Sequence, residues 1–329
     1  MLPVPSPVPA ARRAARRALK TLAAAALVVL AACGGGTSQY EPFVPERLFA
    51  FGDEATALMP DGRNYAINGI NDQGTTDDTS DDAFDCTLQA NWVQSLAGVY
   101  GYAFPQCNPN AAKPEKATNY AAAGARVADV SLQVDAQVAA GGFTASDLVA
   151  VMVGINDLAD LYALYDGTNE ATLIEQARAR GVQTGQIVNR LITLGPKVVV
   201  ANLPDLGATP LAVKEEAAFP GAGRPALLSR LSQAFNEQLG VTILLDGRFV
   251  ALVQTDQRVL AMVRSPGSFL LSNVTDAVCT TPPPNCTTAT LVTDATTSTH
   301  LWAADLLLSS RGQTELATLA IARAQRNPF

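Results

Sequence analysis

The sequence predicts an α/β fold, a three-layer α/β/α sandwich with a central parallel sheet. Short, almost continuous apolar runs each end where polar residues begin, and segments with helical spacing lie between them. Strands that are apolar on every residue are typical of a sheet covered on both faces. With 329 residues, 48% of them hydrophobic, the chain is long enough to bury the core that such a sheet requires.

The predicted strands and helices alternate along the chain. Residues 47–51 (RLFAF) form the first apolar run and predict a buried strand. Residues 147–153 and 197–201 are β-branched runs of the same kind. The spacing of leucine, isoleucine and valine predicts helices over 170–194 and 224–245.

Polar residues follow the first two of these strands. Asp53–Glu54 come after the first, and Asn156–Asp157 come after the second. In a parallel sheet a functional site lies beyond the carboxyl ends of the strands. These four residues are therefore predicted to meet at one site.

Composition excludes several classes of function. The formal charge is −7, and without the five cations before residue 21 it becomes 18 − 30 = −12, so no basic surface for nucleic acid is expected. His300 is the only histidine, which restricts histidine-based catalysis and metal ligation to one position. Residues 72–85 are rich in Asp without EF-hand spacing and predict a solvated loop rather than a calcium site. Neither a metal nor a cofactor is predicted.

The amino-terminal residues predict export. An Arg/Lys-rich segment precedes the apolar stretch 21–32, which is too short to span a bilayer, so residues 1–32 are interpreted as a signal peptide. The string LAAC ending at Cys33 resembles a bacterial lipobox, which implies diacylation of Cys33. Gly34, in place of Asp, resembles outer-membrane sorting. The chain is thus expected in the bacterial cell envelope as an outer-membrane lipoprotein, and its side of that membrane stays open.

The rest of the chain is predicted to be a short tether and one domain. Residues 33–46 contain the lipidated cysteine and a Gly/Ser/Thr/Pro-containing linker, and residues 47–329 form the domain. Four further cysteines in an oxidising compartment predict two disulfides among Cys86, Cys107, Cys279 and Cys286. Three pairings are possible, and the pairing of neighbours closes the shortest loops.

Five motifs occur in a recognisable order. They are FGDEATA at 51–57, NYAAAGA at 119–125, GIND at 154–157, NLPDLGATP at 202–210 and SPGSFLLSNVTDAVC at 265–279. In this order and at these distances they resemble the sequence blocks of the SGNH (GDSL-type) hydrolases over nearly the whole mature chain. The resemblance implies the α/β/α sandwich and ester hydrolysis by a Ser–His–Asp triad.

The triad positions depart from the family pattern. Glu54 stands at the nucleophile position in place of Ser. In the last block, LWAADLLLSSRGQ at 301–313, Ala304 falls at the acid position and Leu307 at the histidine position. A shift by one residue uses Asp305 but then places Leu308 at the histidine position, so neither register supplies an imidazole.

The residues that match the family's oxyanion hole are retained. The resemblance assigns this role to the backbone N–H of Gly124, the side-chain amide of Asn156 and the N–H of residue 54. Such donors stabilise a developing oxyanion. Without an activated nucleophile, no oxyanion develops for them to stabilise.

Three other catalytic interpretations compete with structural ones. Thr56 as a replacement nucleophile competes with helix capping, which is preferred. His300 as a catalytic base paired with Asp294 or Asp305 competes with a loop or surface histidine, also preferred. Glu54 and Asp157 as a glycosidase-like carboxylate pair compete with a supporting role for Asp157.

The predicted function is that of an SGNH-like lipoprotein, catalytically inactive or repurposed to bind a small-molecule, lipid or glycan ligand in its cleft or to serve the envelope. The alternative is an active esterase or lipase on lipid or carbohydrate esters that uses a substituted nucleophile and a displaced His300. A purely structural periplasmic protein is a third possibility and predicts an occluded cleft. The membrane is the expected partner through the lipid anchor, and the oligomeric state stays open.

The lipobox resemblance generates a direct test. Replacing Cys33 by Ser removes the thiol that would be acylated, so Cys33→Ser is expected to move the protein from the membrane fraction to the soluble fraction. Fractionation with immunoblotting measures this, and sequencing of the mature amino terminus locates the cleavage site. A variant that stays with the membrane, together with an amino terminus elsewhere, would contradict the assignment.

Overall fold

The computed structural model describes residues 42–72 and 82–329, and residues from Pro42 onward form one compact unit. The signal peptide, Cys33 and the tether up to residue 41 lie outside the described residues, as do residues 73–81 of the predicted Asp-rich loop. Within the described ranges, no helix has the length and apolar character needed to cross a membrane.

A five-stranded parallel sheet forms the centre of the unit, with strand order β4-β1-β5-β6-β7. The strands are β1 (Arg47–Gly52), β4 (Ala117–Asn119), β5 (Asp147–Met152), β6 (Lys197–Ala201) and β7 (Val250–Val253). All three strands expected from apolar runs are confirmed. Every residue of β5 is buried, as expected for a central strand covered on both faces.

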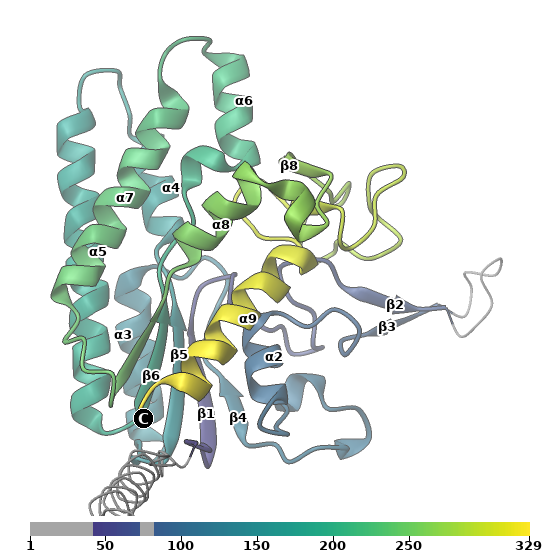
Figure 1. The fold of residues 1–329 in the computed structure, drawn as a ribbon, viewed down its shortest axis with the longest axis vertical. Coiled ribbons are helices and arrows are strands. Elements are labelled where there is room, and N and C mark those ends of the chain that lie inside the picture. Colours follow the sequence, from purple (N-terminus) through teal and green to yellow (C-terminus); the bar gives the residue numbers. More distant parts are fainter. Residues whose placement is uncertain (1–41, 73–81) are drawn as a thin grey trace, which may run out of the picture. The chain divides into compact units, whose positions relative to one another are not determined.

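Helices cover both faces of the sheet and complete the predicted three-layer α/β/α sandwich (Figure 1). On one side lie α3 (Val127–Ala139), α5 (Glu170–Leu194) and α7 (Arg224–Thr242), with α4 (Ile155–Ala163) and α6 (Pro210–Ala218) beyond the strand ends. On the other side lie α2 (Trp92–Gly98), α8 (Thr255–Arg264) and α9 (Ser310–Arg326). The helix predicted over 224–245 ends at Thr242, because Ile243 adopts extended backbone.

Short strand pairs and 3-10 turns lie outside the central sheet. An antiparallel pair joins β2 (Gly69–Asn71) to β3 (Ala83–Asp85), and a parallel pair joins β8 (Asn273–Ala277) to β9 (His300–Trp302). Single 3-10 turns occupy Pro105–Cys107, Pro109–Ala111, Leu206–Ala208 and Pro266–Phe269.

Residues far apart in the sequence close the domain. The Trp92 backbone N–H, at the start of α2, donates to Gln313 Oε1 of α9 at 3.0 Å. The Asn68 side-chain amide donates to the carbonyls of Pro284 and Cys286 at 2.8 and 3.1 Å. Hydrogen bonds therefore join the first third of the domain to its last fifty residues.

Two disulfides link neighbouring cysteines. Cys86 pairs with Cys107 and Cys279 with Cys286, with 5.7 Å between the Cα atoms in both cases. This is the pairing that closes the shortest loops, of 21 and 7 positions. The Cys286 side chain is buried with Ile67 and Val278 in a small second apolar cluster.

The disulfides generate a test by mass spectrometry. Alkylation of the unfolded, unreduced protein is expected to leave the four cysteines unmodified, and reduction beforehand is expected to expose all four. Peptide mapping should recover the two linked peptides in the pairing given above. A free thiol at any of these positions in the native protein, or a crossed pairing, would contradict the structure.

Candidate functional site

The site begins where β1 ends. Gly52 has a φ of +145°, and a Cβ atom there would lie 1.9 Å from the Met152 carbonyl oxygen, so a larger residue would not fit between the two strands. The next residue, Asp53, is fully buried. Its carboxylate accepts hydrogen bonds from the N–H of Ala55 at 3.1 Å and of Gly154 at 3.2 Å. Asp53 thereby joins the loop after β1 to the loop after β5.

The buried carboxylate of Asp53 has an altered acidity. Burial, reinforced by the negative charge of Glu54, raises the pKa of Asp53 to about 7, while the backbone N–H donors act in the opposite direction. Asp53 therefore holds a proton over a pH range in which an exposed aspartate is ionised.

Glu54 and Asn156 meet at the carboxyl ends of β1 and β5, as the sequence predicts. The Asn156 side-chain Nδ2 donates to Glu54 Oε2 at 2.6 Å and to the Ala125 carbonyl at 3.1 Å. Glu54 and Asn156 are both half-buried. Burial, together with the negative charge of Glu54, raises the pKa of the Tyr65 hydroxyl. The side chain at the nucleophile position is thus bound to an amide expected in the oxyanion hole.

Gly124 lies at the surface, and its expected role as an oxyanion-hole donor stays a prediction. It is exposed with a φ of +74°, and its carbonyl accepts a hydrogen bond from Arg126 Nη1 at 2.9 Å. Within the described part of the chain, the Glu54 carboxylate makes no hydrogen bond to the Gly124 N–H. Glu54 therefore engages the Asn156 donor of the predicted hole and leaves the Gly124 donor aside.

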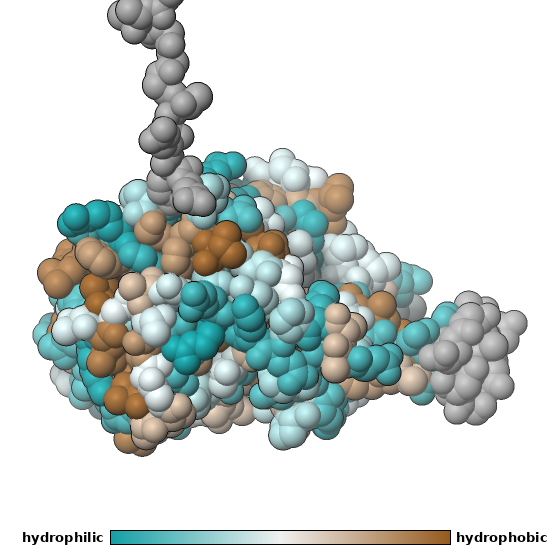
Figure 2. Space-filling model, turned by 90° about the horizontal axis from the view of Figure 1, so that it is seen from below, coloured by the Kyte–Doolittle hydropathy of each residue, from teal (hydrophilic) through white to brown (hydrophobic). Residues whose placement is uncertain are grey.

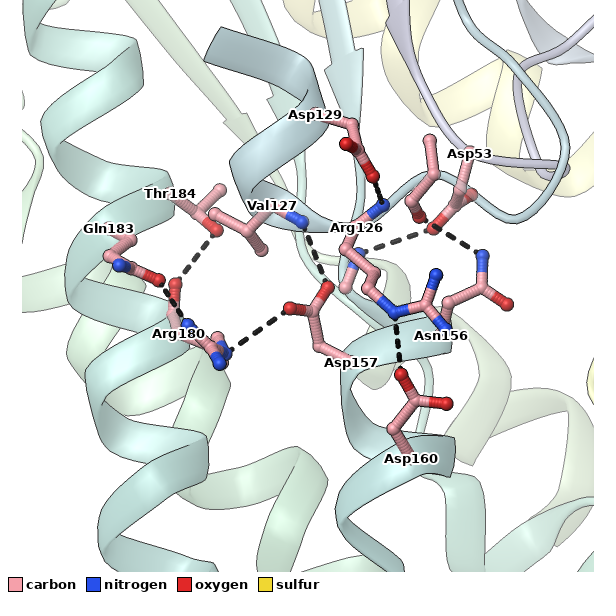
Figure 3. A network of polar contacts seen from close by, with 12 residues as sticks. Asp53, Arg126, Val127, Asp129, Asn156, Asp157, Asp160, Arg180, Gln183 and Thr184 are labelled. Carbon is pink, nitrogen blue, oxygen red and sulfur yellow. Dashed lines mark hydrogen bonds and ion pairs between the residues drawn. The ribbon is translucent and has the colours of Figure 1, made fainter.

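Asp157 has a structural role, which confirms the preferred interpretation (Figure 3). It is buried, and its carboxylate accepts from the Val127 backbone N–H at 2.9 Å, at the first residue of α3. The other oxygen lies 3.3 Å from Arg180 Nε on α5. Burial raises the pKa of Asp157 against these contacts. Because both oxygens are engaged, a glycosidase-like pair with Glu54 is not formed.

A second ion pair lies on the exposed rim of the site and was not predicted. Arg126 Nε lies 2.6 Å from Asp160 Oδ2, and each side chain is about half exposed (Figure 3). The Arg126 backbone N–H is held by Asp129, in the first turn of α3. Arg126 follows directly after the NYAAAGA motif, but its partner is 34 positions away and carries no local signal.

The acid and histidine positions carry apolar side chains in the turn after β9. The N–H groups of Ala303 and Ala304 donate to the Leu307 carbonyl at 2.8 and 3.4 Å, which closes the turn. Ser309 then caps α9 by accepting from the N–H groups of Arg311 and Gly312. Alanine and leucine side chains supply no group for proton transfer.

The two nearby candidates for a base, Asp305 and His300, are each held by another residue. Asp305 is paired with Lys214 Nζ of α6 at 2.5 Å. His300 is buried at the start of β9, and its Nδ1 lies 2.9 Å from Thr299 Oγ1. Burial lowers the pKa of His300, so the imidazole is neutral at pH 7. Neither Asp294 nor Asp305 pairs with it. The preferred interpretation of a loop or surface histidine is wrong, because His300 is the buried first residue of β9.

Thr56 differs from the expectation in detail. It is fully buried, and its Oγ1 accepts from Trp92 Nε1 at 3.3 Å. The segment after Asp53 consists of turns rather than a helix, so the predicted capping role is wrong. Packed against the indole, the hydroxyl has a structural role. Among the described residues no cluster of three or more His, Cys, Asp or Glu side chains suits a metal ion.

Comparisons with known proteins agree with the fold. The family model described as GDSL-like lipase/acylhydrolase matches residues 48–249. Curated proteins include no match to the chain.

Solved structures give remote similarities. A lipase, Lip_vut3, from a goat rumen metagenome is 11% identical, with 86% of this chain and 99% of that chain covered and a TM-score of 0.48. An acetylxylan esterase from Geobacillus stearothermophilus, Axe2, is 16% identical, with 86% and 96% covered and a TM-score of 0.42. A member of the lipolytic protein G-D-S-L family from Veillonella parvula DSM 2008 is 11% identical, with 84% and 96% covered and a TM-score of 0.41.

Asp53 makes folding stability depend on pH. Its pKa in the folded protein is about 7, above the value of about 3.9 for an unfolded chain. The stabilising contribution of the bound proton is therefore complete below about pH 4 and is lost as the pH rises through 7, by at most about 4 kcal/mol.

Asp53→Asn is expected to remove this part of the pH dependence. Urea unfolding of wild type and variant between pH 4 and pH 8 measures it, with the exposed Asp160→Asn as a matched control. Relative to Asp53→Asn, the wild type should lose stability with rising pH. Parallel curves for the two proteins would show that the buried carboxylate is not the source.

Proposed function

We propose that this chain, which belongs to the GDSL-like lipase/acylhydrolase family, is an envelope lipoprotein that keeps the family's fold but binds a ligand instead of hydrolysing esters. The observation that carries the proposal is the 2.6 Å hydrogen bond from Asn156 Nδ2 to the Glu54 carboxylate. In this arrangement a built-in anion uses a donor that a reaction intermediate would need.

Charge supports the loss of ester hydrolysis. One oxyanion-hole donor stabilises the transition state by about 3 kcal/mol. Two negative charges about 4 Å apart repel each other by about 4 kcal/mol at an effective dielectric constant of 20. An ionised Glu54 therefore offsets the benefit of Asn156 for any ester whose carbonyl oxygen becomes negative beside it.

The apolar residues at the acid and histidine positions support the same conclusion. A serine or threonine hydroxyl requires a base within hydrogen-bonding distance to attack an ester. Ala304 and Leu307 stand at the acid and histidine positions, and Asp305 is engaged by Lys214. The His300 side chain is hydrogen-bonded to the side chain of the adjacent Thr299.

The same groups indicate what a ligand would meet. Glu54 offers a carboxylate whose charge is only partly compensated by the Asn156 amide, and the Arg126–Asp160 pair on the rim is neutral as a whole. A neutral or cationic polar group suits this surface better than an anion. Small molecules, glycans and lipid head groups of that charge are the ligand classes we propose.

A second candidate function is ester hydrolysis with Glu54 as the nucleophile. Membership of an acylhydrolase family favours it. The Glu54 carboxylate would attack the ester carbonyl, the bond to the alcohol would break, and the departing alkoxide would take a proton from water. A second water would then cleave the acyl anhydride, which releases the carboxylic acid and restores the Glu54 carboxylate. Lipid or carbohydrate esters would be the substrates.

An ester assay separates the two functions. With p-nitrophenyl acetate and butyrate, wild type is expected to release p-nitrophenol no faster than heat-inactivated protein. Glu54→Ala should be equally inactive and less stable by about 2 kcal/mol, because it removes a hydrogen bond to a charged group. Wild-type turnover well above the blank, lost in Glu54→Ala, would establish the second candidate instead.

Variants that restore the triad serve as the positive control. Glu54→Ser alone should stay inactive, since the hydroxyl has no base. Glu54→Ser combined with Ala304→Asp and Leu307→His is expected to regain weak hydrolysis if the backbone has kept the family geometry. Activity of the triple variant alone would attribute the loss to the side chains rather than to the fold.

A further inference from the structure

One end of the domain is formed by the starts of the parallel strands and the ends of the helices that return to them. We call it the strand-start face. It comprises the first residues of the five strands with the two residues before each, the last five residues of α3, α5, α7 and α9, and the loops after these helices. Figure 2 views the molecule from this end and shows apolar patches between polar side chains. The candidate site lies at the opposite ends of the strands.

Apolar side chains are exposed on the strand-start face. They are Val138, Val241, Leu244 and Leu245, and the exposed Val44 immediately precedes the residues of this face that lead into β1. Leu244 and Leu245 are adjacent and 65% and 59% exposed.

The backbone that carries these leucines is well anchored. The Asn189 carboxamide of α5 accepts from the Leu244 N–H at 2.8 Å and donates to the Thr242 carbonyl at 2.9 Å. The Asp246 N–H donates to the Leu244 carbonyl at 2.7 Å. The two leucines therefore protrude from an ordered loop.

The same face differs in charge from the rest of the domain. Its cations are Arg47, Lys116, Arg190, Lys197, Arg248, Arg323 and Arg326, and its carboxylates are Glu46, Glu115, Asp135, Asp147 and Asp246. The excess is 7 − 5 = +2, whereas the chain after residue 20 carries 18 − 30 = −12. A positive, partly apolar face on an acidic protein is complementary to an anionic lipid surface.

The chain enters the domain at this face. The Phe43 ring packs against the Phe329 ring, with centroids 5.7 Å apart, and the Glu46 N–H donates to the Ser146 carbonyl just before β5. Residues 34–41 separate Cys33 from Pro42. Even fully extended, that stretch spans only about 30 Å. A lipid on Cys33 would therefore hold the strand-start face close to the bilayer.

We propose that the strand-start face docks on the surface of an anionic phospholipid bilayer, with Leu244 and Leu245 entering the interface and the surrounding cations facing the phosphates. The candidate site then points away from the membrane. This proposal rests on the lipid anchor and not on the chemistry of the site, so the outcome of the ester assay does not bear on it.

The full-length lipoprotein in vesicles of phosphatidylethanolamine and phosphatidylglycerol provides the test. Leu244→Cys and Leu164→Cys are labelled with an environment-sensitive dye, since Leu164, which follows α4 beyond the opposite strand ends, is 64% exposed and matches Leu244. The dye at position 244 is expected to shift to shorter wavelength and to be quenched by nitroxide-labelled lipids. The dye at position 164 should do neither. Adding Arg323→Glu and Arg326→Glu should reduce the quenching at position 244.

Two further measurements make the result decisive. Intact mass reports whether the chain is acylated, and Val44→Cys provides a second labelling position should Leu244→Cys fail to fold. Quenching at position 244 or 44 no stronger than at 164 would overturn the proposal. A chain that carries no acyl group and does not float with the vesicles would overturn it as well.

Discussion

The buried carboxylate of Asp53 is the contact on which the arrangement of the site depends. It accepts N–H groups from its own loop and from Gly154, and so fixes the distance between the ends of β1 and β5. Glu54 extends from one of these ends and Asn156 from the other. Their hydrogen bond is possible because the two loops are already joined beneath it. Burial makes ionisation of Asp53 costly, which is the energetic consequence of placing this link in the core.

The contacts that support the site do not depend on the groups that would carry out a reaction. Asp157 positions the start of α3, and Asn156 presents an amide between the strand ends. These contacts are made with backbone groups or with a carboxylate, and none depends on a catalytic serine or histidine. Such a scaffold does not require a Ser–His–Asp triad, which is why family membership and activity must be considered separately.

Much of the fold could be predicted from sequence because its signals are local. The apolar runs that became β1, β5 and β6 are continuous, and the helix over 170–194 has its boundaries at the predicted residues. By contrast, β4 has only three residues and β7 four, too few for a periodic pattern to stand out. Their places in the sheet depend on pairing with β1 and β6.

The residues of the site could also be predicted only where a local sequence motif marks them. Motif order correctly predicted that Glu54 and Asn156 meet, but contacts between distant residues could not be predicted from it. The Arg126–Asp160 pair and the Lys214 contact that engages Asp305 join separate elements. Gly124 has a positive φ, and its carbonyl accepts from Arg126 Nη1; the motif alone does not specify this contact.

The hydrogen bond between Trp92 and Gln313 has a consequence for the order of events during biosynthesis. It spans 221 positions, and α2 packs against α9, the last helix of the described chain. Contacts of such large sequence separation form late, because the whole intervening chain must be closed into a loop. The amino-terminal part cannot complete its packing until the final helix has been synthesised. A protein with this closure therefore stays open for longer than one built from local contacts.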